Sequence, residues 1–591
     1  MRRNIARFAT LVGIFALITM FNNCSGFSGI NSSPSSQASS ASTSPSGPNS
    51  SNAPSGPSGY DYPSTGIQMN NMPGIWMAYP GDARPILDCQ NKGTCIGLSG
   101  NVQSPALFQG FDITNSSFKF FWLDGDKSPV TWRNNIMHGI TVTNPNDAYE
   151  NPAFIFTQDY TGGTTPVYQH LILQNNQVYD LNNYNHDIHI SPATFYDVSH
   201  SLEEDNVIHD IYDGTCIEDK DDGWYNTYRN NVCYNVDGGS GIGLYSQYSQ
   251  GQIEIENNLL IGNSNGRNLI DVGSQPGYIR NIYIHNNTLV NGFIGFGNPI
   301  YNQSAGTYVI AHNLFYDDST TAPLEFYGVN GSFDPSTIGQ PSCVGTATQC
   351  PPITASQAYV SSLLTGNEAL FKDNWYWSPD STQKMMTWSW QQYGLNLSQW
   401  QNLGFDSAGG FFFTQQPSFL ATGAYSSSND YSLAPTDPNY SVYGKDSTPS
   451  ANTTSYTGWA LQFIGIDLTT AYPGIQYYSR LAVVGGLYPY TFKLLTAPTG
   501  MQIQPRTGEI TWTPTQDNTT VNVDVQVTDS AGTTATHSFT IQVTKNNFYF
   551  IDAVNGSDSN PGTLQAPFRT LLGVQQKGLP ATATLYFRGG P

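Results

Sequence analysis

Arg229-Asn230-Asn231-Val232 is one copy of a short pattern that returns through the middle of the chain. Neighbouring copies are Glu256-Asn257-Asn258-Leu259 and His285-Asn286-Asn287-Thr288. The second asparagine of the pattern falls at Asn135, Asn176, Asn206, Asn231, Asn258, Asn287 and Asn313, in steps of 41, 30, 25, 27, 29 and 26 residues. Periods of this size are typical of solenoids, whose repeats bury their apolar faces only by stacking on one another.

The segments around the asparagines have the composition of strands rather than of helices. Ile253-Glu254-Ile255 and Val309-Ile310 are short β-branched runs, and glycine and asparagine separate such runs. Asparagine tolerates left-handed backbone angles, and its side-chain amide can bond the equivalent amide of the next repeat. The sequence therefore predicts an all-β chain built on a parallel β-helix, with the repeated asparagines stacked along one edge.

The charge of the chain excludes some classes of partner. Charged residues make up 11% of the 591 residues, and the net charge is −21. Globular proteins carry about 25% charged residues. A strongly acidic surface argues against nucleic acid and against anionic membrane surfaces as partners. An acidic polysaccharide remains compatible with this charge when a cation bridges the two.

The N-terminal segment is predicted to direct secretion. Residues 1–24 combine a basic start with an apolar run that is short for a spanning helix, and Cys24 follows the run. This segment resembles a bacterial lipoprotein signal, which implies that Cys24 is lipidated and that the protein is an outer-membrane lipoprotein or lies at the cell surface. An ordinary cysteine of a signal peptide is the alternative. Residues 25–65, rich in Ser, Pro and Gly, are predicted to form a disordered tether.

Setting Cys24 aside leaves six of the seven cysteines. Cys89 with Cys95 and Cys343 with Cys350 are predicted to close two small disulfide loops, which secretion permits. For Cys216 and Cys233 the pairing stays open, because the two residues could lie on different faces of the solenoid.

Two resemblances define the domains. Gly74–Gly81, Arg84–Asp88 and Ala106–Asn115 are similar to the early coils of right-handed parallel β-helix proteins related to pectate lyases, and the likeness extends over residues 66–470. Alternating segments such as Thr507–Pro514 and Val521–Asp529 resemble a cadherin-like, immunoglobulin-type β-sandwich of bacterial surface proteins, placed at residues 478–545. The resulting fold class is a right-handed parallel β-helix with a small β-sandwich domain.

Residues 547–591 resemble the opening coil of the same β-helix family, although they follow the sandwich. A solenoid end exposes apolar side chains and unpaired strand edges and so needs a cap. The order of the chain therefore predicts a circular permutation, in which 547–591 cap the 66–470 solenoid and Leu585-Tyr586-Phe587 pair in parallel with Ile75-Trp76-Met77. A second β-helix that begins in this segment is the alternative.

Stacked coils turn equivalent positions into surface columns. The aligned runs are His186–Ile190, Thr215–Lys220, Gly241–Tyr245 and Asn268–Val272. If Ile188, Ile217, Ile242 and Ile270 point inward, the neighbouring column that points outward contains His189, Glu218, Gly243 and Asp271. Lys220 and Tyr245 fall in the next outward column.

The β-helix resemblance implies a polysaccharide lyase, in which Ca²⁺ acidifies a uronate proton and a basic side chain removes it. On this interpretation Lys220 and His189 are the catalytic candidates. Tyr245 and Trp224 are the candidates for binding sugar rings. The possible metal ligands are Glu218, Asp219, Asp221 and Asp222.

Three alternatives stay open. The acidic residues can be ordinary solvated turns with Lys220 as a neutralising charge. A hydrolase would need two facing carboxylates, for which Asp219 with Asp222 and Glu218 with Asp271 are the candidate pairs. The third alternative is a non-catalytic surface adhesin that binds glycans, which the tether and the sandwich favour.

Overall fold

The computed structural model describes residues 67–68, 72–98, 106–124, 129–141, 153–158, 168–182, 191–221, 223–238, 241–246, 249–262, 267–274, 278–297, 308–317, 323–326, 369–379, 384–388, 393–402, 404–406, 411–412, 416–422, 431–447 and 459–589. Five residues with predicted roles lie outside the described residues: Cys24, His189, Asp222, Cys343 and Cys350. Among the described residues, no helix is long and apolar enough to cross a membrane.

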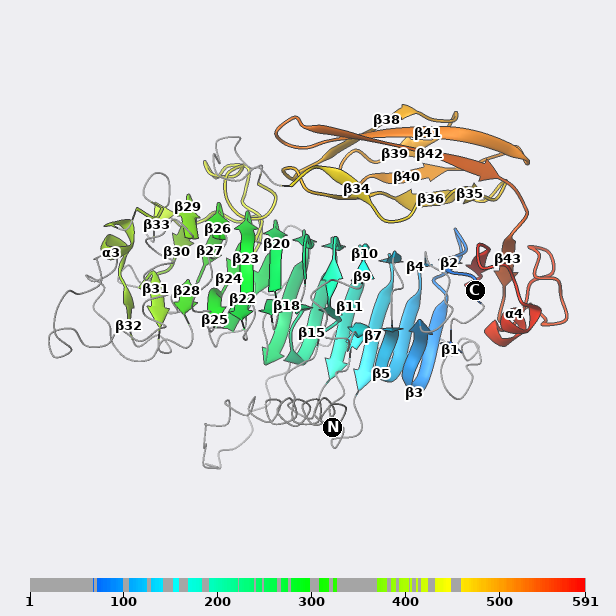
Figure 1. The fold of residues 1–591 in the computed structure, drawn as a ribbon, viewed down its shortest axis with the longest axis horizontal. Helices are drawn as coiled ribbons and strands as arrows, with labels where there is room; N and C mark the ends of the chain where they lie inside the picture. Colours follow the sequence, from blue (N-terminus) through cyan, green and yellow to red (C-terminus); the bar gives the residue numbers. More distant parts are fainter. Residues whose placement is uncertain are drawn as a thin grey trace, which may run out of the picture. The chain divides into compact units, whose positions relative to one another are not determined.

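The predicted all-β class and parallel β-helix are confirmed (Figure 1). A typical coil consists of β14 (Leu202–Glu204), β15 (Val207–Gly214) and β16 (Ile217–Lys220). Each strand pairs in parallel with its equivalents in the neighbouring coils. The coil therefore has three faces, one in a 12-stranded sheet and two in a 21-stranded sheet.

The 12-stranded sheet runs in the order β29 (Ala369–Lys372), β26 (Tyr308–Ala311), β23 (Tyr278–His285), β20 (Ser249–Glu256), β17 (Thr227–Arg229), β14, β10 (Leu171–Gln174), β6 (Val130–Arg133), β4 (Ala106–Gln109), β2 (Ile75–Ala78), β44 (Thr584–Phe587) and β43 (Phe548–Ile551). A two-stranded pair, β13 (Val198–Ser199) with β9 (Tyr168–Gln169), lies at one corner.

The 21-stranded sheet contains two ladders that meet at β5 (Asp112–Asp124), which also pairs with β3 (Ile86–Leu98), itself paired with β1 (Ile67–Gln68). The first ladder continues through β7 (Ile136–Thr141), β11 (Gln177–Asn182), β15, β18 (Val232–Gly238), β21 (Leu259–Ile261), β24 (Thr288–Val290), β27 (Leu314–Tyr316), β30 (Trp375–Trp377) and β33 (Phe411–Phe412). The second continues through β8 (Ala153–Gln158), β12 (Ala193–Tyr196), β16, β19 (Ile242–Ser246), β22 (Arg267–Ser274), β25 (Gly292–Gly297), β28 (Leu324–Phe326), β31 (Met386–Trp388) and the antiparallel β32 (Tyr393–Leu395), which α3 (Leu397–Asn402) follows.

The predicted asparagine ladder is confirmed. Asn231 donates from Nδ2 to Oδ1 of Asn258 at 3.2 Å and to the carbonyl of Glu203 at 2.8 Å, and its backbone N–H bonds the same Oδ1. The same contacts link Asn135, Asn176, Asn206, Asn231, Asn258, Asn287, Asn313 and Asn374, with 3.0 to 3.2 Å between consecutive side chains. The residue before each ladder asparagine, such as Asn230 with φ 57°, is left-handed.

An aspartate ends the ladder. Oδ1 of Asp406 accepts from the backbone and the side chain of Asn374, and Oδ2 accepts from Tyr376 and from the indole of Trp400. All of these groups are donors, so a carboxylate matches this position better than an amide, whose NH₂ would face other donors.

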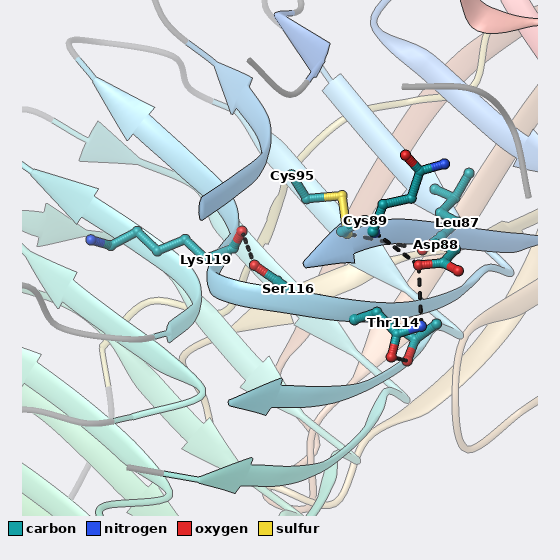
Figure 2. Close-up of a disulfide and its surroundings, with 9 residues drawn as sticks. Leu87, Asp88, Cys89, Cys95, Thr114, Ser116 and Lys119 are labelled. Carbon is teal, nitrogen blue, oxygen red and sulfur yellow. Dashed lines mark hydrogen bonds between the residues drawn. A yellow bond between two sulfur atoms is a disulfide. The ribbon is translucent and has the colours of Figure 1, made fainter. Parts of the chain in front are cut away.

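In the part of the chain that the structure describes, two disulfides link segments of the coils. Cys89 and Cys95, both on β3, are bonded as predicted (Figure 2). Cys216 and Cys233 are also bonded, although the sequence left their pairing open. Both are buried in the core between β16 and β18, because their side chains point inward from two faces of adjoining coils.

The C-terminal segment forms a coil of the β-helix, as predicted. β44 pairs in parallel with β2, with Trp76 opposite Leu585, and β43 pairs with β44. Figure 1 shows β43 at the same end of the solenoid as β2. The rings of Trp76 and Phe587 lie 5.3 Å apart. Helix α4 (Leu571–Lys577) packs Leu571 and Val574 into the same core, so the apolar side chains at this end of the solenoid are covered.

The sandwich consists of β35 (Thr470–Ala471), β42 (Thr534–Val543), β41 (Thr519–Thr528) and β38 (Thr491–Thr496) in one sheet, β36 (Tyr477–Arg480), β40 (Glu509–Trp512) and β39 (Gln502–Ile503) in another, and the pair β34 (Gln462–Ile464) and β37 (Ala482–Val484). It packs on the outer face of the 12-stranded sheet, where Ile172 and Leu202 contact Ala482 and Val484. The sequence predicted the β-sandwich, but it did not predict that the sandwich packs on this sheet.

Candidate functional site

The register of the strands corrects one predicted column. Ile217, Ile242 and Ile270 are paired as expected, but Ala193 of β12 takes the place that Ile188 was expected to have. The outward column therefore contains Thr194, Glu218, Gly243 and Asp271, and the prediction that placed His189 beside Glu218 is wrong. Ile217 follows Asn206 by 11 residues, whereas Ala193 follows Asn176 by 17, so six more residues separate the asparagine from the paired position there.

Glu218 and Lys220 form the centre of the candidate site. Lys220 Nζ lies 3.4 Å from Glu218 Oε1 and 3.2 Å from the hydroxyl of Tyr196, and Thr194 bonds the other oxygen of Glu218 at 3.4 Å. Glu218 is 1% exposed and Lys220 6%. Two opposite charges that are this close and this buried stabilise each other strongly.

Tyr245 and Asp271 extend the site by two coils. The hydroxyl of Tyr245 donates to Asp271 Oδ2 at 3.1 Å. The Tyr245 ring covers Gly243, because a Cβ at that position would lie 2.5 Å from the ring. The ring thus lies between Glu218 and Asp271, and Lys220 Nζ is 6.0 Å from its centroid. Tyr245 and Asp271 are both part-exposed.

The electrostatics give Lys220 and Asp271 different chemistry. Burial lowers the pKa of Lys220, but Glu218, Tyr196 and Asp221 together outweigh burial, so the pKa is raised overall. Lys220 is therefore a permanent cation at neutral pH. Burial raises the pKa of Asp271 to about 7, against the opposing hydrogen bonds from Tyr245 and Asn268. Asp271 can therefore hold or release a proton near neutral pH.

Asp219 does not share this face. It is fully buried in the interior, where its carboxylate accepts hydrogen bonds from Asn226, Tyr228 and Gln250. The prediction that Asp219 joins Glu218 in one metal site is therefore wrong, because alternate residues of a strand point to opposite faces. Burial raises the pKa of Asp219 to about 6, in spite of these three hydrogen bonds.

The remaining predicted residues, Asp221 and Trp224, both follow the C-terminal end of β16. Asp221 directly follows the strand in a left-handed conformation, and its N–H bonds the carbonyl of Tyr245. Trp224 pairs with Ser199 and Gly251 at the corner leading to the 12-stranded sheet, and the exposed Arg280 covers its ring at 5.2 Å. Trp224 is thus in a different ladder from Tyr245.

A charged network under the sandwich had no counterpart in the sequence predictions. Arg229 bonds Glu204 at 2.6 Å and Glu256 at 3.4 Å, and its guanidinium also donates to the carbonyl of Val483 in the sandwich. Next to it, Glu254, Glu256 and His285 bring ligand atoms within 4.8 Å of one another. Acidic and basic residues at one equivalent strand position were the available signal, namely Glu204, Arg229, Glu256 and His285. Only the tertiary contacts show that this position faces the sandwich.

Residues 447–544 match the family model described as "Putative Ig domain". The sandwich is an Ig-like module. The matched range contains the strands from β34 to β42 and does not extend over the strands of the β-helix. No curated protein and no solved structure gives a significant match to the chain.

Proposed function

We propose that the protein is an extracellular, glycan-binding β-helix protein, and that the outer face of β16, β19 and β22 binds the polysaccharide. The observation that supports this proposal is the Tyr245 ring, which is part-exposed between two carboxyls and beside the Lys220 ammonium. Aromatic rings take the apolar face of a sugar, and flanking charged groups take its hydroxyls or its carboxylate. As part of this proposal, we infer that the β-helix is related to those of pectate lyases.

Secretion and anchoring form part of this function. The two disulfides in the described part of the chain are compatible with an oxidising compartment. We place the protein at the cell surface or on the outer membrane, with Cys24 as the lipidated residue and the lipid as its membrane contact. The tether of residues 25–65 would then hold the β-helix away from the membrane.

Cleavage of the glycan is a second candidate function, and Asp271 favours hydrolysis. A carboxyl with a pKa near 7 can donate a proton to a leaving glycosidic oxygen. Glu218, two coils away in the same column, is the second carboxylate that hydrolysis requires. Calcium-assisted elimination with Lys220 as the base is less favourable, because the neighbouring Glu218 keeps its ammonium protonated. A base must lose its proton before it can accept another.

The binding proposal is tested by affinity gel electrophoresis against a panel of neutral and uronate polysaccharides. Tyr245→Ala is expected to lose at least about tenfold in affinity, since one aromatic contact contributes roughly 1.5 kcal/mol. Tyr440→Ala, an exposed tyrosine outside this face, serves as the matched control. Equal binding by the two variants, both with unchanged melting temperatures, would contradict the proposal.

The cleavage candidates are separated by their products. Hydrolysis releases reducing ends without a double bond and should fall sharply in Asp271→Asn, whereas elimination gives an unsaturated product that absorbs in the ultraviolet. Elimination that requires calcium and is lost in Lys220→Met would reinstate the lyase interpretation. Binding without either product would identify the non-catalytic adhesin.

A further inference from the structure

Within the described part of the β-helix, a cluster of buried polar residues lies in the interior beside the 12-stranded sheet. Positions that point inward on the 12-stranded sheet follow the ladder Leu173, Glu203, Tyr228, Ile255 and Ile284. Leu173 and the two isoleucines belong to the continuous apolar core. Glu203 interrupts this core. The Tyr228 hydroxyl and the side chains of Asp219, Asn226 and Gln250 are further buried polar groups of the same interior. These five residues are called the inner polar cluster here.

Hydrogen bonds account for only part of the inner polar cluster. Asp219 accepts from Tyr228 at 2.7 Å and from Asn226 and Gln250 at 2.9 Å each. Among the described residues, neither carboxylate oxygen of Glu203 has a hydrogen-bond partner, and Gln250 Oε1 has none either. Glu203 is 1% exposed and Gln250 is fully buried. Three acceptor oxygens therefore face the interior with no donor.

The unpartnered carboxylate oxygens of Glu203 require either a positive charge beside them or a bound proton. Burying an ionised carboxylate without a partner is expensive, and a second carboxylate nearby makes it more so. The Asp219 charge is among the causes that raise the pKa of Glu203, after burial itself. The backbone also accommodates Asp219 specifically, because a Cβ at Gly223 would lie 2.1 Å from Asp219 Oδ1.

We propose that the inner polar cluster binds one Ca²⁺ ion, through the carboxylates of Glu203 and Asp219 and the amide oxygen of Gln250. The donor set consists of oxygens, which calcium prefers and which zinc sites rarely use alone. Two carboxylates and one divalent cation give a neutral core. The ion has a structural role in joining the coil of Glu203 and Asp219 to the coil of Gln250, independent of glycan binding.

The Glu254, Glu256 and His285 group is a weaker candidate for a metal site. Its ligand atoms are close together, but the Arg229 guanidinium lies 3.4 Å from Glu256 and already supplies a positive charge. In the inner polar cluster, by contrast, no arginine or lysine contacts Glu203 or Asp219 among the described residues.

The test measures metal content and stability of the purified full-length chain. Mass-spectrometric metal analysis after gel filtration in metal-free buffer should find about one calcium per chain, as expected for a caged oxygen site. Glu203→Gln should reduce this to less than a tenth, with the melting temperature of the wild-type protein lowered by chelator and that of the variant unaffected. Glu218→Gln, which alters the outer face instead, should keep the calcium.

Two results would overturn the proposal. One is the absence of calcium from the wild-type protein together with a melting temperature that neither added calcium nor chelator changes, which would mean that protons neutralise the cluster. The other is loss of calcium in Glu218→Gln but not in Glu203→Gln, which would place the ion on the outer face. If Glu203→Gln is poorly folded, terbium luminescence sensitised by nearby tyrosine, measured in Asp219→Asn, makes the same distinction.

Discussion

Replacing Asn231 by leucine tests the asparagine ladder at its centre. Asn231 is fully buried, and its side chain both accepts from the N–H of Asn206 at 3.1 Å and donates to the carbonyl of Glu203 at 2.8 Å. Leucine has the same branching at Cγ but neither the acceptor nor the donor, so both backbone groups lose their ladder partner. The Nδ2 of Asn206 keeps its second acceptor, the carbonyl of Leu173.

The expected cost follows from these two groups. Each buried group left without a partner destabilises a protein by about 1–3 kcal/mol, so Asn231→Leu should lose about 2–6 kcal/mol of unfolding free energy. That is a large part of a typical total of about 5–15 kcal/mol. Equilibrium urea unfolding, followed by circular dichroism and by tryptophan fluorescence, measures the difference.

Asn522→Leu is the matched control, because Asn522 is an exposed strand residue of the Ig-like module. Its unfolding free energy should stay within about 0.5 kcal/mol of the wild type. If Asn231→Leu is as mild as this control, the ladder contacts do not stabilise the solenoid and the reasoning is refuted.

Three further predictions concern other parts of the chain. Burial raises the pKa of Asp271 from 3.8 to about 7, so between these pH values the folded state binds a proton that the unfolded state does not, and stability should fall as pH rises from about 4 to 7. Asp271→Asn should flatten this part of the profile of melting temperature against pH. An unchanged slope would exclude Asp271 as its source. Trp76→Ala removes the ring that contacts Phe587 and should lower the free energy of unfolding by about 3–5 kcal/mol. Limited proteolysis should then cleave the 547–589 coil faster than in the wild type. Cleavage at the wild-type rate would count against the docking of that coil. The double variant Cys216→Ser, Cys233→Ser should be about 2–4 kcal/mol less stable than the wild type in thermal melts. The control Thr536→Ser, at an exposed position of the Ig-like module, should keep the wild-type stability. A double variant as stable as this control would show that the disulfide does not constrain the unfolded chain.

The candidate site shows where inference from the sequence fails. The pairing of Glu218 with Gly243 and Asp271 could be predicted, because Ile217, Ile242 and Ile270 follow their asparagines at nearly constant distances. His189 was misplaced because Ala193, the residue that pairs with Ile217, follows its asparagine at a larger sequence distance than Ile217 does, and this distance carries no pattern of its own. Asp219 was misassigned because the sequence of an acidic turn does not show where the strand ends and alternation stops.

The solenoid, the asparagine ladder and the pairing of β44 with β2 could all be predicted from the residues alone. These depend on local chemistry that repeats in every coil, namely left-handed asparagines, β-branched strands and the apolar pattern of an opening coil. Only the tertiary structure decided that the Ig-like module covers the 12-stranded sheet and that Glu203 and Asp219 meet inside the β-helix. Both depend on contacts between residues far apart in the chain, such as Arg229 with Val483, and no local periodicity encodes them.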